Sequence, residues 1–88
     1  MKATFRKSFA RDLKKVKDQM VLDRVREAIG EVEAATGLLE ISNLKKMSGT
    51  SNFYRIRVGD YRIGVVVEEN VIEFVRCLPR RDLYRFFP

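Results

Sequence analysis

Three arginines lie close together in segment 53–67 (FYRIRVGDYRIGVVV), and their spacing indicates a surface that binds phosphate. Apolar residues alternate on both sides of Gly59-Asp60, a dipeptide that suits a two-residue β-turn. In the resulting hairpin Arg57 pairs with Arg62, and the period of two puts Arg55 on the same face. Like charges that oppose each other across a strand pair are destabilising, and a bound phosphate or polynucleotide backbone would explain their presence.

An acidic neighbour is the alternative explanation for these arginines. Asp60, Glu73 and Asp82 are the carboxylates near enough in the expected fold to neutralise them. Because three arginines share the face and acidic residues are few, the phosphate interpretation is favoured.

Two further groups flank the hairpin and extend its chemistry. Before it come Lys45 and Lys46, and after it the tail 80–88 carries Arg80, Arg81 and Tyr84. Arginine and lysine bind phosphate, and an exposed tyrosine ring can stack on a base, which is a combination suited to RNA. Phe86 and Phe87 of the same tail are expected to pack in the core beneath the edge of the sheet.

The composition excludes several classes of site. The chain has no histidine and a single cysteine, Cys77, so Ser-His and Cys-His nucleophile pairs, an internal disulfide and a conventional zinc site are excluded. Cys77 is expected to be a small strand residue rather than a nucleophile. No cofactor or metal is therefore expected.

Charge is unevenly distributed along the 88 residues, which carry 18 Lys and Arg against 12 Asp and Glu, a net of +6. The first 17 residues contribute +6, segment 18–44 contributes −4, and segment 45–88 contributes +4. Such segregation is typical of a protein that binds nucleic acid or phosphate, and a solubilising surface with a basic bias is the alternative explanation.

The elements that must position these groups follow from periodicity. Residues 2–6 (KATFR) are predicted to form an edge strand. A short amphipathic helix is predicted next, with Ser8 as its N-cap, and a second helix from Val21 to Ala35 with Gly37 as its stop. Within the second helix, Gly30 is a candidate site of close helix crossing.

The second half of the chain is predicted to be a sheet. The two strands of the hairpin are followed by a third strand over residues 71–78, which Pro79 ends. The expected fold is α+β: a single domain over residues 1–88, ordered β-α-α-β-β-β, with an antiparallel sheet and both helices on one face.

These motifs together resemble the RelE/ParE superfamily of toxins from type II toxin–antitoxin systems. The matching residues are Leu44-Lys45, Gly49, Tyr54-Arg55-Ile56-Arg57-Val58-Gly59-Asp60-Tyr61-Arg62 and Arg80-Arg81-Asp82-Leu83-Tyr84. The resemblance covers essentially the whole chain, and it implies a microbial-ribonuclease-like fold. It is closer to the RelE-like members, which cleave mRNA on the ribosome without a metal.

The resemblance also implies roles for individual residues. The 2′-hydroxyl of RNA attacks the adjacent phosphate, giving a 2′,3′-cyclic phosphate and a free 5′-hydroxyl. Arg62 would bind the scissile phosphate, Arg80 would stabilise or protonate the leaving group, and Tyr84 would orient or stack on the nucleotide. The groups expected to grip RNA are Lys45, Lys46, Arg55, Arg57 and Arg81.

Two positions depart from the superfamily pattern. Pro79 stands where several members have a basic, histidine-like residue, and Arg57 stands where some active members have a lysine as candidate base. Arginine is a poor proton acceptor. The base is then Lys45, Lys46 or Tyr84, or else catalysis depends on stabilisation of the phosphorane and on positioning.

Two other functions fit the same superfamily. A ParE-like toxin inhibits DNA gyrase by binding alone, and a third type of member is a catalytically weak module that binds RNA or protein. The expected partners of a RelE-like toxin are an antitoxin, the ribosome and mRNA, with DNA reached only through the antitoxin. No apolar signal core occurs in MKATFRKSFARDLKK, so a cytoplasmic protein without membrane contact is expected.

Overall fold

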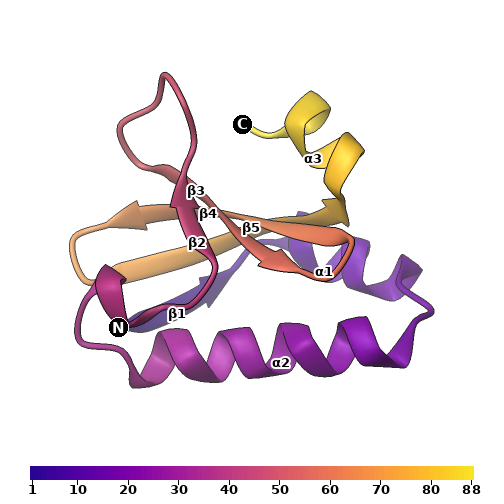
Figure 1. Ribbon diagram of the computed structural model, residues 1–88, viewed down its shortest axis with the longest axis horizontal. Helices are drawn as coiled ribbons and strands as arrows, with labels where there is room; N and C mark the ends of the chain where they lie inside the picture. The colour runs from indigo at the N-terminus through magenta and orange to yellow at the C-terminus, as the bar shows by residue number, and fades with distance from the viewer.

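The computed structural model describes all residues, 1–88, and has two layers of helix around one five-stranded sheet (Figure 1). The elements in chain order are β1 (Lys2–Phe5), α1 (Lys7–Lys15), α2 (Gln19–Ala34), the 3₁₀ helix η1 (Leu38–Glu40), β2 (Leu44–Lys46), β3 (Phe53–Val58), β4 (Tyr61–Glu68), β5 (Val71–Pro79) and α3 (Arg80–Phe86). The predicted α+β class and the helix pair on one face are confirmed.

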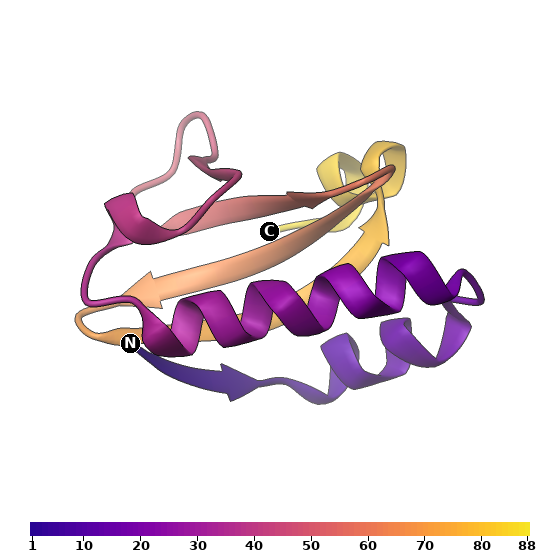
Figure 2. The same ribbon diagram turned by 60° about the horizontal axis from the view of Figure 1, so that its bottom comes forward.

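The sheet is mixed, not antiparallel as expected. Its strand order is β1-β5-β4-β3-β2, and β1 runs parallel to β5 with Lys2 opposite Val71 and Phe5 opposite Phe74. The helices α1 and α2 connect β1 to β2 across one face of the sheet (Figure 2). β5 pairs with β4 on one side, and β1 lies along its other side. The other edge strand, β2, has only three residues, too few for its alternation to stand out in the sequence.

Both faces of the sheet are buried, which explains the uninterrupted valines of β4. The main core lies between the sheet and α1 and α2, and includes Phe9, Ile63 and Phe74. A smaller core lies on the opposite face beneath α3, where Leu83 and Phe87 pack on the sheet. A strand that is covered on both sides has no reason to alternate in polarity.

The helix boundaries differ from the sequence prediction at both helices. The first helix begins at Lys7, and Ser8 is not its N-cap: the Ser8 hydroxyl donates a hydrogen bond to the carbonyl of Val75 at 2.6 Å. The second helix is capped by Asp18 and ends at Ala34, so Gly37 is not its stop. In the first helix a tertiary hydrogen bond uses the side chain that was expected to cap it. In the second, Asp18 provides the cap and the helix ends before Gly37.

The remaining expectations about local structure have mixed outcomes. A Cβ on Gly30 would meet no atom within 4 Å, so no helix crosses closely there. The Gly59-Asp60 turn is as predicted, with the positive φ of +62° at Gly59 that a type II′ turn requires. In the tail Phe87 is buried as expected, whereas Phe86 is 56% exposed.

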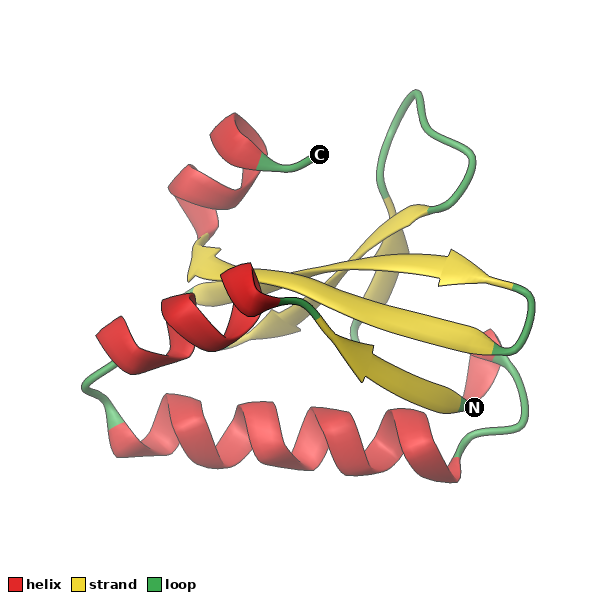
Figure 3. Ribbon diagram, turned by 180° about the vertical axis from the view of Figure 1, so that it is seen from behind, coloured by secondary structure: helices red, strands yellow, loops and turns green.

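The C-terminal helix lies over the face of the sheet that α1 and α2 do not cover, as the view from behind also shows (Figure 3). No helix is long and apolar enough to cross a bilayer.

Candidate nucleic-acid interface

The strand register brings basic side chains into direct opposition on the α3 face of the sheet. Arg57 lies opposite Arg62 across β3 and β4, as predicted, and Lys45 lies opposite Arg55 across β2 and β3. None of these four side chains forms an ion pair: the two salt bridges of the molecule join Arg6 to Glu73 and Arg76 to Asp12. Neutralisation by Asp60, Glu73 or Asp82 is therefore not the explanation of the hairpin arginines.

A shallow depression of about 350 Å³ gathers basic groups from β2 and β3 beside an aromatic ring of α3. It is lined by Lys45, Lys46, Met47, Ser48, Arg55 and Tyr84, which come from β2, the loop after it, β3 and α3. Tyr84 is 51% exposed, so its ring is available to a ligand. A cationic wall beside an exposed aromatic ring is an arrangement that suits single-stranded nucleic acid.

Tyr84 also lines a second, wider depression at the start of α3. This depression measures about 630 Å³ and is lined by Asp60, Pro79, Arg80, Arg81, Asp82 and Tyr84. The backbone N–H of Arg80 donates to the carbonyl of Asp60 at 2.9 Å, which ties the start of α3 to the hairpin turn. Because Tyr84 belongs to both depressions, they form one continuous surface, which we call the cationic track.

Arg62 differs from the other arginines because it is only 8% exposed. Its Nη1 donates to the carbonyls of Gly59 at 2.8 Å and Tyr61 at 2.9 Å, and its buried Nε has no partner. The guanidinium thus braces the hairpin turn from below. Strand periodicity predicted the face of the sheet on which Arg62 lies, but periodicity does not indicate how deeply a side chain on that face is buried.

Asn43 is a positioning residue that sequence reasoning missed. Its carbonyl accepts hydrogen bonds from Nη1 of Arg55 at 3.1 Å and from the backbone N–H of Arg57 at 3.2 Å. Asn43 has a left-handed backbone with φ of +62°, a conformation that asparagine tolerates better than most residues. An asparagine directly before a lysine-rich strand was the available signal.

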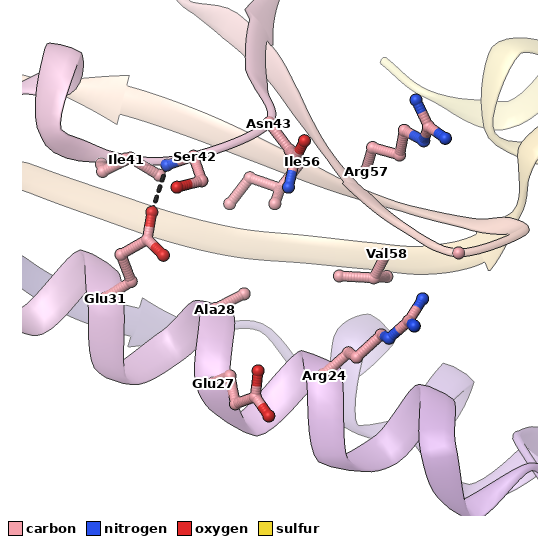
Figure 4. A pocket seen from close by; sticks show the side chains of 11 residues that line it. Arg24, Glu27, Ala28, Glu31, Ile41, Ser42, Asn43, Ile56, Arg57 and Val58 are labelled. Carbon is pink, nitrogen blue, oxygen red and sulfur yellow. Dashed lines mark hydrogen bonds between the residues drawn. The ribbon is translucent and has the colours of Figure 1, made fainter.

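A separate depression of about 410 Å³ lies between α2 and β3. Arg24, Glu27 and Glu31 contribute to its wall from α2, and the carboxylate of Glu31 accepts a hydrogen bond from the backbone of Ser42 (Figure 4). Figure 4 also shows that the Arg57 side chain points away from α2. Arg57 also lines this depression, whose wall carries two arginines and two glutamates, whereas the depression beside Lys45 and Arg55 has no carboxylate in its lining.

Cys77 is buried in the main core and is not a nucleophile. Burial, aided by the nearby carboxylate of Asp12, raises the pKa of the Cys77 thiol to about 12. A thiol with that pKa is not ionised at neutral pH, which agrees with the expectation of an inert strand residue. No group of three Cys, Asp or Glu side chains is placed to hold a metal ion.

Comparison with known proteins gives a family match and close relatives. Residues 3–84 match the sequence profile of the ParE toxin of the type II toxin–antitoxin system, parDE. Toxin RelE3 of Methanocaldococcus jannaschii is 40% identical over 89 residues, which cover 100% of both chains.

Solved structures agree with this match. The RelB–RelE antitoxin–toxin complex from Methanococcus jannaschii contains a chain that is 39% identical, with a TM-score of 0.81 over 97% of this chain and 99% of that one. The archaeal RelE–RelB complex from Pyrococcus horikoshii OT3 contains one that is 25% identical, with a TM-score of 0.71 over 90% and 93% of the two chains.

Proposed function

The chain belongs to the RelE/ParE superfamily as a RelE-type toxin of a type II toxin–antitoxin system, and we propose that it is a metal-independent, ribosome-dependent mRNA endonuclease. The observation that carries this proposal is the cationic track, in which Lys45 of β2 and Arg55 of β3 meet Tyr84 of α3 with no carboxylate paired to the two cations. A surface of this kind is complementary to a phosphate backbone with unstacked bases.

The proposed reaction is an attack within the RNA itself. The 2′-oxygen forms a bond to the adjacent phosphorus while the bond from phosphorus to the 5′-oxygen breaks, leaving a 2′,3′-cyclic phosphate. The proton of the 2′-hydroxyl passes to a base, and a donor supplies a proton to the departing 5′-oxygen. Cations that surround the phosphorane lower the barrier because negative charge accumulates there in the transition state.

The cationic track offers a group for each of these roles. Arg80 lies at the start of α3 and lines the wider depression, where it can stabilise or protonate the leaving oxygen. Tyr84 lies between the two depressions and can stack on the nucleotide. Lys45, Lys46 and Tyr84 line one depression, so each of the three candidate bases lies beside the proposed path of the RNA.

Arg62 requires a modified role. Its guanidinium is held by two backbone carbonyls, and direct contact with the scissile phosphate would need the side chain to leave them. In this geometry the buried Arg62 adds positive electrostatic potential beneath the surface of the sheet. Its hydrogen bonds to the turn also keep the hairpin rigid. The grip on RNA is therefore assigned to Arg55, Arg57 and Arg81, of which Arg57 and Arg81 are exposed.

The test is primer extension on an mRNA that is incubated with ribosomes and the purified protein. Arg80→Gln is expected to lower the rate of cleavage by about 100-fold, the usual effect of removing one group that stabilises a transition state. Arg26→Gln is the matched control, because Arg26 is exposed on α2 and lies outside the cationic track. Equal cleavage by Arg80→Gln and the wild-type protein would contradict the assignment.

A ParE-like inhibitor of DNA gyrase is the second candidate, and the parDE family match favours it. Such a toxin acts by binding and needs no catalytic group. A supercoiling assay separates the two functions: inhibition of gyrase by a protein that does not cleave mRNA on ribosomes would reverse the ranking.

We also propose that an antitoxin binds this protein, since the relatives from M. jannaschii and P. horikoshii were solved with RelB. An acidic or amphipathic segment that orders on binding would mask the cationic track. Copurification with the product of the neighbouring gene tests this, and the absence of a complex would count against it.

A further inference from the structure

We propose that Asp12 is a positioning residue: by holding a β-bulge in β5, it sets the face of the sheet from which Arg80 and Tyr84 emerge. Asp12 lies on α1, on the far side of the sheet from α3, and is only 5% exposed. A carboxylate is rarely buried to this extent unless it is paired. Asp12 lies outside the cationic track, so RNA binding does not explain its burial. The catalytic part of the inference rests on the proposed function; the structural part does not.

The bulge lies where β4 and β5 lose their regular pairing. Gly64 lies opposite Arg76, but the next residue of β4, Val65, lies opposite Phe74. Val75 is therefore an extra residue in β5 with no counterpart in β4. An insertion of this kind bends the strand and changes the direction of the side chains that follow it.

The consequence of the bulge is a change of face. Before it, Ile72 and Phe74 point to the helix face of the sheet; after it, Cys77 does so, and Leu78 packs beneath α3. In an unbulged strand the even-numbered residues would all stay on the helix face, because side chains alternate with a period of two. Leu78 would then point toward α1, and α3 would leave the sheet on the wrong side.

Two side chains of α1 hold the bulge in place. β1 ends beside Phe74, so the rest of β5 has no strand on that edge. Ser8 donates its hydroxyl proton to the carbonyl of Val75 at 2.6 Å, and Asp12 accepts the backbone N–H of Cys77 at 2.9 Å. The two residues are one helical turn apart and bond backbone groups that a neighbouring strand would otherwise satisfy.

Arg76 completes the network. Its Nε donates to one oxygen of Asp12 at 2.8 Å and its Nη2 to the other at 3.2 Å, the two-pronged geometry of an arginine–carboxylate pair. The hydrogen bond to Asp12 raises the pKa of Arg76. Figure 3 shows α1 against the part of β5 that leads to α3, so the network reaches from one face of the sheet to the element on the other.

The test combines amide hydrogen exchange, nuclear Overhauser contacts and cleavage kinetics for Asp12→Ala and Asp12→Asn. In Asp12→Ala we expect exchange of the Cys77 amide to accelerate at least about tenfold, because a buried charge-assisted hydrogen bond is lost. Contacts between Arg62 and Leu78 should weaken, while those between Val66 and Glu73, on the other side of the bulge, should persist. Asp12→Asn keeps one oxygen for Cys77 and is expected to give a smaller change in the same direction.

The kinetic readout distinguishes positioning from general loss of stability. The cleavage rate at saturating protein should fall at least about tenfold in Asp12→Ala, while the protein concentration for half-saturation stays unchanged. A smaller folded fraction alone would raise that concentration instead. Asp23→Asn is the matched control, because Asp23 is exposed on α2 and bonds only Gln19 of the same helix.

Two outcomes would overturn the inference. One is unchanged Cys77 exchange together with intact contacts between Arg62 and Leu78 in both Asp12 variants. The other is a disturbed bulge with a normal rate of cleavage at saturation. If the wild-type protein does not cleave mRNA, the proposed function fails, and the exchange and contact measurements still decide the role of Asp12 in holding the bulge.

Discussion

Arg57 and Arg62 lie directly opposite each other in the β3–β4 hairpin, and neither is paired with a carboxylate. The two charges are accommodated differently. Arg62 is buried and bonds the carbonyls of the turn, whereas Arg57 is exposed. A repulsive pair of this kind costs stability, and its retention is explained if the exposed member binds an anion.

Replacement of Arg57 should separate stability from function. Arg57→Gln is expected to raise the free energy of unfolding by about 0.5 kcal/mol, because the repulsion across the strand pair disappears. Urea denaturation at low and high salt measures this, and the gain should shrink in high salt. The same variant should bind RNA more weakly, with Arg26→Gln as the control. A loss of stability in Arg57→Gln would contradict the account.

Tyr84 variants should distinguish stacking from chemistry at the hydroxyl. Tyr84→Ala is expected to weaken RNA binding by about 1–3 kcal/mol, the value of one base stacked on an aromatic ring. Tyr84→Phe keeps the ring and should bind RNA nearly as well as the wild-type protein. Fluorescence anisotropy with a labelled single-stranded RNA measures both affinities. Equal affinities for Tyr84→Ala and the wild-type protein would exclude the stacking role.

Gly64 and Gly30 form a matched pair for testing the C-terminal segment. A Cβ on Gly64 would lie 2.7–2.9 Å from ring atoms of Phe87, which is buried and packs edge-on against Phe53. Gly64→Ala should therefore destabilise the protein by about 1–3 kcal/mol. Gly30→Ala, in open space within α2, should stabilise it by about 1 kcal/mol. Thermal melting measures both, and a neutral Gly64→Ala would show that Phe87 moves freely.

The buried thiol of Cys77 should make stability fall in alkaline solution. Burial raises its pKa from 9.0 to about 12 in the folded protein. As the pH rises, the thiol therefore ionises first in the unfolded chain. The contribution of Cys77 to the free energy of unfolding is fully present below pH 9 and is lost as the pH rises toward 12. Between pH 8 and pH 10 the free energy of unfolding should fall by about 1.4 kcal/mol from this group.

Cys77→Ala is the control for that measurement. It lacks the titrating thiol, so its stability should decline less steeply over the same range, even though its absolute stability is lower. Parallel pH profiles for the two proteins would contradict the assignment.

Much of the architecture was predictable because it follows from short-range rules. The alternation around Gly59-Asp60 determined the hairpin, its turn and the opposition of Arg57 and Arg62. The segregated charge led to phosphate as the proposed ligand, which the RNA-binding experiments above test. The motifs around Tyr54 and Arg80 led to the correct superfamily. The hairpin and each single motif depend on residues that are near one another in the chain.

What only the tertiary structure decided depends on contacts between distant segments. The burial of Arg62, the convergence of Lys45 with Tyr84 and the parallel pairing of β1 with β5 leave no local pattern. The role of Asp12 is of the same kind, since its partner Cys77 lies 65 residues away. Local periodicity determines which face a side chain shares with its neighbours. Depth and convergence are determined by what packs on that face, here α3 on one side of the sheet and α1 and α2 on the other, which only the fold brings there.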